Sequence, residues 1–176
     1  MGFNDAKLDL ATVFQAQYER IARVIAGVIK DPARAEELAV EVFLKWERTP
    51  KAQREGTEGW LYRTAVRIAL NELRRKTLRN RYEHLLGFLT SKSSGSTPHE
   101  IYAEQEEQQR VRLVLSVIEP RQAELLLLRS NDLSYQELAS ILNLNPNSVG
   151  TLLSRALAAF RKEFIQRYGK ERYGYK

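Results

Sequence analysis

The stretch "SYQELASILNLNPNSVGTLLSRA", residues 134–156, contains two helical patterns separated by a short break. Ser134 and Glu137 have the spacing of a capping box, in which the hydroxyl and the carboxylate each accept a hydrogen bond from a backbone N–H at the helix start. Asn145 and Pro146 suit the start of a second helix, because the missing proline N–H would have no partner there. The stretch therefore predicts a helix, a tight turn and a second helix.

Each of these two helices has one apolar face that requires a partner. The apolar positions are Leu138, Ala139, Ile141 and Leu142 in the first helix and Val149, Leu153, Ala156 and Phe160 in the second. When Val149 faces inward, the turn of about 100° per residue places five polar side chains outward. These are Asn147, Ser148, Thr151, Ser154 and Arg155. Such a face suits base edges and phosphates in a helix-turn-helix module, and the alternative is an αα-hairpin whose polar face is solvated.

Three further helical patterns lie within the first 75 residues. Apolar residues recur at steps of three and four over residues 10–29, and a second helix is expected over 31–46, with Asp31 as its N-cap. Residues 47–59 contain proline, two glycines and no period, which predicts a loop. A third helix is expected from Trp60 to about Arg75.

The segment "TSKSSGSTP", residues 90–98, has the Ser/Gly composition of a flexible tether. Thr97 and Glu100 predict a capped helix after it, and Pro120 begins another. Because strand patterns are negligible, the expected fold is all-α: two small helical domains joined by a flexible linker. The predicted units are a first domain at 1–82, a linker at 83–98, a second domain at 99–168 and a basic tail at 169–176.

The third predicted helix carries a basic stripe opposite an apolar one. Its apolar side consists of Leu61, Ala65, Ile68, Ala69 and Leu73, and its polar side of Arg63, Arg67, Asn71, Arg74 and Arg75. Guanidinium groups lined along one helix can neutralise several phosphates together. The alternative is an ordinary solvated helix face.

Composition excludes several function classes. Lys and Arg outnumber Asp and Glu by 28 to 22 in 176 residues, which favours a polyanionic partner. The chain has no cysteine, which excludes disulfides, a thiol nucleophile and thiolate zinc sites and fits a reducing cytoplasm. His84 and His99 are far apart in sequence, and a metal site needs several convergent donors. We expect no enzyme activity, cofactor, metal or membrane insertion, because no catalytic constellation, phosphate-binding glycine loop or bilayer-length apolar stretch is present.

Three segments together resemble one protein family. The segment "IEPRQAELLLLRSNDLSYQELASILNLNPNSVGTLLSRALAAFRK" (118–162) resembles the C-terminal promoter-binding domain of bacterial sigma factors, especially the extracytoplasmic-function (ECF) group. The segments "DPARAEELAVEVFLKWER" (31–48) and "GWLYRTAVRIALNELRRK" (59–76) resemble the family's second conserved region, in the expected order. The resemblance covers nearly the whole of residues 10–165 and implies promoter recognition and DNA melting for transcription initiation.

The resemblance also implies roles for particular residues. Core RNA polymerase would bind Glu36, Glu37, Glu41 and Lys45, and the loop at 48–59 would capture an unstacked base of the −10 element through Lys51, Gln53 or Arg54. The basic stripe would hold −10 DNA. Contacts to the −35 element would come from Ser134 and the five outward residues of the last helix. Core RNA polymerase, promoter DNA and an anti-sigma factor are the implied partners.

Several residues depart from the family pattern and leave two interpretations open. Val40 replaces a typical glutamine, and Gly150 and Leu152 stand in the recognition helix where basic residues are common. One interpretation is an active sigma factor with unusual −35 recognition. The other is a sigma-like module that engages an anti-sigma or other regulatory protein without directing promoters. In either case the two domains should lie closer together in the free chain than on a promoter, because a relaxed tether of about 20 residues spans only about 25 Å.

Overall fold

The computed structural model describes residues 9–54, 56–89 and 99–169, and this part of the chain is helical, without strands. Eight helices are described, which confirms the all-α prediction. In chain order they are α1 (Leu10–Ile29), α2 (Pro32–Glu47), α3 (Pro50–Arg54), α4 (Thr57–Leu89), α5 (His99–Val117), α6 (Pro120–Arg129), α7 (Tyr135–Leu142) and α8 (Pro146–Tyr168).

Helices α1, α2 and the first part of α4 pack around an apolar core. Ile21, Phe43 and Trp46 are fully buried in it, and Phe14 lies with its ring centroid 4.9 Å from that of Phe43. As predicted, Asp31 caps α2, where its carboxylate accepts a hydrogen bond from the Arg34 N–H at 3.1 Å. The first three long helices thus form one packed half of the molecule.

The segment at 47–59 is not simply the loop that the sequence predicts, because α3 lies within it. The Trp46 Nε1–H donates to the Ala52 carbonyl at 3.1 Å, and the buried Gln53 amide donates to the Glu47 carbonyl at 2.6 Å. Gly56 then turns the chain with a φ of +69°, which favours glycine. A single helical turn is too short to show a period in the sequence.

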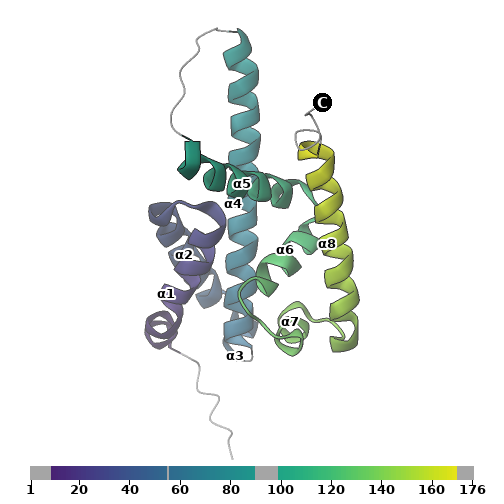
Figure 1. The fold of residues 1–176 in the computed structure, drawn as a ribbon. Coiled ribbons are helices and arrows are strands. Elements are labelled where there is room, and N and C mark those ends of the chain that lie inside the picture. The colour runs from purple at the N-terminus through teal and green to yellow at the C-terminus, as the bar shows by residue number, and fades with distance from the viewer. Residues whose placement is uncertain (1–8, 55, 90–98, 170–176) are drawn as a thin grey trace, which may run out of the picture.

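Helix α4 is longer than predicted and forms the middle of the molecule. It continues to Leu89, within the stretch predicted as linker, and its C-terminal end projects beyond the other helices (Figure 1). Leu73 is buried, whereas Leu78 and Tyr82 farther along are exposed. Apolar periodicity marks only the buried part of a helix, so the sequence pattern weakens before the helix ends.

The helix, turn and helix predicted at 134–156 are present as α7 and α8. The capping box is confirmed: the Ser134 N–H donates to Glu137 at 2.7 Å, and the Glu137 N–H donates to the Ser134 hydroxyl at 3.2 Å. Asn145 caps α8, and Pro146 is its first residue. Leu138, Ala139, Val149, Leu153 and Ala156 are all buried, as predicted. The predicted cap at Thr97 lies outside the described residues.

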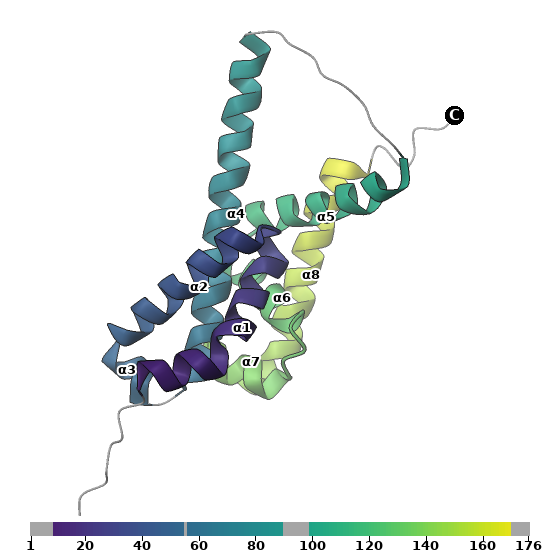
Figure 2. The ribbon, with the colours of Figure 1, turned by 90° about the vertical axis from the view of Figure 1, so that its left-hand side faces the viewer.

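The two halves of the chain are packed together rather than separate. Helices α1 and α2 cover one side of α4, and α5, α6 and α7 pack against it from the second half (Figures 1 and 2). Gly59 near the start of α4 approaches Ile141 of α7 so closely that a Cβ there would lie 3.0 Å from the Ile141 Cγ1 atom. The two units are therefore in direct contact in the free chain.

Candidate nucleic-acid interface

Three arginines of the predicted basic stripe face the second half of the chain. Arg63 donates to the Ile141 carbonyl at 2.9 Å, and the Arg67 Nε–H lies 2.9 Å from a Glu124 oxygen. Arg74 donates to two carbonyls near the end of α5, that of Ser116 at 3.1 Å and that of Ile118 at 3.3 Å. These side chains are thus engaged by protein acceptors along the seam between the halves.

The other two residues of the stripe are exposed. Because successive residues turn by about 100°, Arg63, Arg67 and Arg74 lie within about 40° of one another around α4. Asn71 and Arg75 lie about 80° and 120° farther round from Arg63. Both face solvent. The stripe therefore extends farther around α4 than the part that contacts the second half.

Glu124 of α6 belongs to this site, and sequence reasoning missed it. Only 5% of its side-chain surface is exposed, while 55% of the paired Arg67 side chain is exposed. A carboxylate excluded from water in this way depends on its cationic partner. In the sequence Glu124 stands before a run of four leucines, and nothing local indicates that a residue 57 positions away pairs with it.

The three loop residues predicted to capture a base differ in their surroundings. Lys51 on α3 is exposed. Gln53 is buried and its amide donates to two backbone carbonyls, so in this conformation it holds the segment together. The side chain of Arg54 lies outside the described part of the structure.

The predicted recognition face of α8 is open. Asn147, Ser148, Thr151, Ser154 and Arg155 are all exposed, and Ser134 is exposed at the start of α7. Asn143 ends α7 in the left-handed conformation at a φ of +54°, which turns the chain sharply into α8. The helix pair thus presents its polar face outward, with a buried face packed on the rest of the second half.

Leu152 and Gly150, the two residues that depart from the basic family pattern, lie at the side of the recognition face of α8. Leu152 is partly buried against the core, so this position borders the packed face rather than the polar one. A Cβ added to Gly150 would meet a Tyr135 ring carbon at 3.5 Å, an ordinary van der Waals distance. Neither residue occupies the centre of the exposed recognition face.

The four predicted polymerase contacts, Glu36, Glu37, Glu41 and Lys45, are exposed on α2. Glu41 and Lys45 form an ion pair at 2.8 Å. Val40 and Leu44, which the sequence reasoning did not include, lie beside them one helical turn apart and are 40% and 43% exposed. This outer face of α2 therefore combines charged side chains with an apolar pair.

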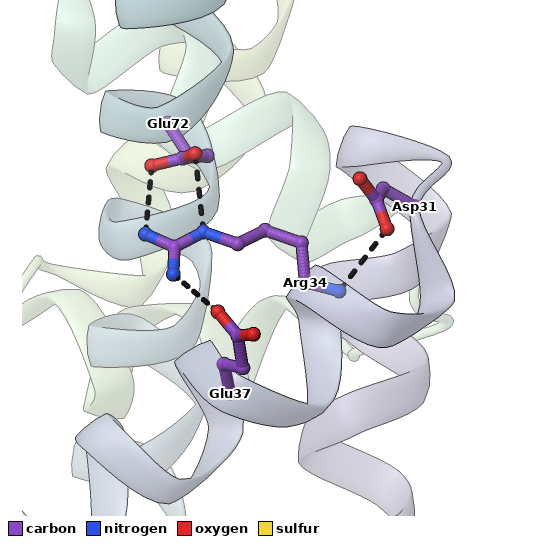
Figure 3. Close-up of polar contacts among 4 residues, drawn as sticks. All are labelled: Asp31, Arg34, Glu37 and Glu72. Carbon is purple, nitrogen blue, oxygen red and sulfur yellow. Dashed lines mark hydrogen bonds and ion pairs between the residues drawn. The ribbon is translucent and has the colours of Figure 1, made fainter.

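Arg34 fixes the position of α2 against α4 (Figure 3). Its guanidinium contacts both oxygens of Glu72 on α4, at 3.2 and 3.4 Å, and also lies 2.6 Å from Glu37. The hydrogen bonds to Glu72 and Glu37 raise the pKa of Arg34 above its ordinary value. The ion pairs hold the outer face of α2 at a defined angle to the arginine stripe.

The part of the chain that the structure describes contains no helix long and apolar enough to cross a bilayer. Within the same residues, no three His, Cys, Asp or Glu side chains gather as a metal site would require.

Comparison with family models identifies both halves of the chain. Residues 13–79 match sigma-70 region 2, and residues 108–160 match sigma-70 region 4 in its ECF-type form. No curated protein matches the chain. The two matched regions contain the arginine stripe of α4 and the exposed face of α8, in the order that the sequence resemblance implies. The chain belongs to the sigma-70 family of bacterial RNA polymerase sigma factors, in its extracytoplasmic-function group.

Proposed function

We propose that this sigma factor binds core RNA polymerase and places it on promoters by contacting the −10 element with α4 and the −35 element with α8. The observation that carries this proposal is that one chain holds two separate polar surfaces suited to DNA. One is the row of arginines on α4, and the other is the open face of α8. Two surfaces on one chain suit the recognition of a promoter with two elements.

The α4 surface suits DNA backbone binding and strand opening. Arginines contact phosphates and position the DNA, while sequence is read by contacts to bases. Opening DNA requires no catalytic residue, because binding of the single-stranded form offsets unstacking, which costs a few kcal/mol per base step. Exposed Lys51 on α3 lies in the segment proposed to receive an unstacked base.

The outer face of α2 is the proposed contact with core polymerase. Exposed apolar side chains at the centre of a protein interface contribute affinity, and charged neighbours contribute specificity and association rate. Val40 and Leu44 supply the apolar part, and Glu36, Glu37, Glu41 and Lys45 supply the charges. This face is exposed in the free chain, so polymerase can bind it without rearrangement of the halves.

The test is reconstitution with core polymerase on a promoter library, scored by open-complex formation. Arg75→Ala is the informative variant because Arg75 is exposed and its loss leaves the seam between the halves intact. We expect the variant to lower promoter affinity and to reduce the slope of log affinity against log salt by about 0.9 if Arg75 contacts one duplex phosphate.

The control is Arg23→Ala, which removes a cation at an exposed α1 position outside the proposed sites. It should leave promoter affinity and the salt slope nearly unchanged. If the unmodified chain fails to bind core polymerase but binds an anti-sigma protein tightly, the alternative of a regulatory module replaces the proposed function.

A further inference from the structure

We propose that the projecting end of α4 binds double-stranded DNA on the upstream side of the −10 element, through a second stripe of side chains beyond the basic one. This inference deepens the proposed function of α4 and rests on it. The segment concerned, "RRKTLRNRY" (74–82), contains five Arg or Lys residues and no Asp or Glu. Such a concentration of positive charge along one helix suits a polyanion, because several phosphates can be neutralised together.

This part of α4 stands apart from the packed halves. Leu73 is buried, and Arg74 still donates to carbonyls near the end of α5. Beyond Arg74 the helix extends past the other described helices in both views (Figures 1 and 2). Arg75, Lys76 and Arg79 are exposed there, and none of them forms an ion pair within the described ranges. They are therefore open to an outside partner without any rearrangement of the two halves.

Four exposed side chains share one face of this projecting end. Because successive residues turn by about 100°, Arg79 lies about 40° to one side of Arg75 around the helix. Tyr82 and Leu78 lie about 20° and about 60° to the other side, and they are 60% and 55% exposed. We call these four residues, which fall within a sector of about 100°, the projecting stripe.

The composition of the projecting stripe suits a DNA backbone. Arginine and tyrosine side chains are both common donors to phosphate oxygens and sugars. An acidic protein surface would also attract the two arginines. DNA is favoured because the stripe begins at Arg75, which also belongs to the basic stripe proposed to hold −10 DNA, so the two surfaces are continuous along one helix.

The distance along α4 indicates paired rather than opened DNA. Helix α4 begins at Thr57, directly after α3, which carries the exposed Lys51 proposed to receive an unstacked base. At a rise of 1.5 Å per residue, Arg75 and Tyr82 lie about 27 and about 37 Å from that start. At 3.4 Å per base pair these lengths correspond to about 8 and about 11 base pairs. The projecting stripe thus lies far from the bases that α3 would capture.

The chain connection indicates the side of the −10 element on which this contact falls. Only nine residues join the end of α4 to α5, so this end stays close to the half that carries α8. Because α8 is the proposed reader of the −35 element, the projecting end of α4 faces the DNA between the two elements. Phosphate contacts there would fix the orientation of the duplex without reading its sequence.

The test compares two promoter fragments that both lack a −35 element, bound by the full chain assembled with core polymerase. The short fragment starts at the upstream edge of the −10 element, and the long one carries about 11 further base pairs on that side. We expect the wild-type chain to bind the long fragment several-fold more tightly. Arg79→Ala should remove most of this gain and lower the slope of log affinity against log salt on the long fragment by about 0.9, the value for one duplex phosphate.

The variants are chosen to separate this contact from effects on folding. Alanine is the best helix former, so Arg79→Ala keeps α4 helical. Arg79→Lys retains the charge and should retain the salt slope. Arg23→Ala removes an exposed arginine of α1 and should leave the gain from the longer fragment intact.

Several results would overturn the inference. Equal binding of both fragments by the wild-type chain would do so, as would an equal loss on both fragments in Arg79→Ala. An equal gain from a single-stranded extension of the same length would contradict duplex binding, and failure of Arg79→Ala to assemble with core polymerase would assign the stripe to a protein contact. If the wild-type chain forms no open complex on a complete promoter, the proposed function fails instead, so the two failures are distinguishable.

Discussion

Arg34 shows how one side chain sets the geometry of the first half. Its planar guanidinium spans both Glu72 oxygens and also reaches Glu37, an arrangement that a lysine ammonium cannot reproduce (Figure 3). Because 39% of the Arg34 side chain is exposed, solvent screens part of this interaction.

We therefore predict that Arg34→Lys lowers the free energy of unfolding by up to about 1 kcal/mol. Denaturant unfolding at low ionic strength measures the change. Arg23→Lys, at an exposed position on α1, is the control and should have little effect. If the two variants unfold alike, Arg34 does not hold α2 to α4 in solution.

The capping box at the start of α7 predicts that the stability of the fold depends on pH. Hydrogen bonds from Ser134 lower the pKa of Glu137 below its ordinary value. A lowered pKa in the folded state means that the ionised carboxylate stabilises the fold at neutral pH, and that this contribution is lost as pH falls through the lowered value.

Glu137→Gln should therefore lower the Tm at pH 7, and the difference from wild type should shrink as acid protonates Glu137 in the wild-type protein. Thermal unfolding followed by circular dichroism from pH 7 to pH 3 checks this. A difference that stays constant over the whole range would show that Glu137 does not take part in the cap.

At the scale of elements, the sequence predicted helices best where burial and caps coincide. The start of α2 at Asp31 and the α7–α8 pair were predicted because a polar cap precedes an apolar period at each. Helix α3 and the last turns of α4 were missed. The former is a single turn, and the latter leaves Leu78 and Tyr82 exposed, so neither produces the periodic signal.

Substitution of alanine for glycine should have opposite effects at two helical positions, Gly150 and Gly59. Gly150 has room for a Cβ at 3.5 Å from its nearest neighbour, whereas a Cβ on Gly59 would press on Ile141 at 3.0 Å. Gly150→Ala should raise the free energy of unfolding by about 0.5–1 kcal/mol, because alanine has the higher helix propensity.

Gly59→Ala gains the same propensity, but we expect it to push α7 away from α4 and loosen the seam. Denaturant unfolding and hydrogen exchange on α4 and α7 distinguish the two. Unchanged exchange at the seam in Gly59→Ala, together with equal stabilisation by both variants, would contradict the close packing of α4 on α7.

At the scale of the whole molecule, the candidate site was only partly predictable from the sequence. The arginines of α4 and the polar face of α8 follow from helical periodicity within each segment. The partners of Arg63, Arg67 and Arg74 do not, because they are backbone carbonyls and a buried carboxylate brought in by tertiary packing. A row of arginines in a sequence indicates a surface that can bind anions. It does not show which protein acceptors contact those arginines in the free chain.

The connection between the two halves limits how far they can separate. Helix α4 ends at Leu89 and α5 begins at His99, so nine residues join them. Fully extended, nine residues reach only about 30 Å, whereas promoter elements two helical turns apart lie about 70 Å apart. Engagement of both elements therefore depends on the size of the helical bodies, including the projecting end of α4, as well as on the connection.

The central claim is that promoter DNA binds the arginines of α4, three of which contact the second half of the chain in the free protein. The most direct test is the distance between spin labels on cysteines introduced at the exposed residues Gln15 of α1 and Gln136 of α7, in a chain that has no other thiol. We predict one short, narrow distance distribution for the free protein and a distinctly longer one for the same chain bound to core polymerase on promoter DNA. An identical distribution in both states would contradict the binding of promoter DNA to this face of α4.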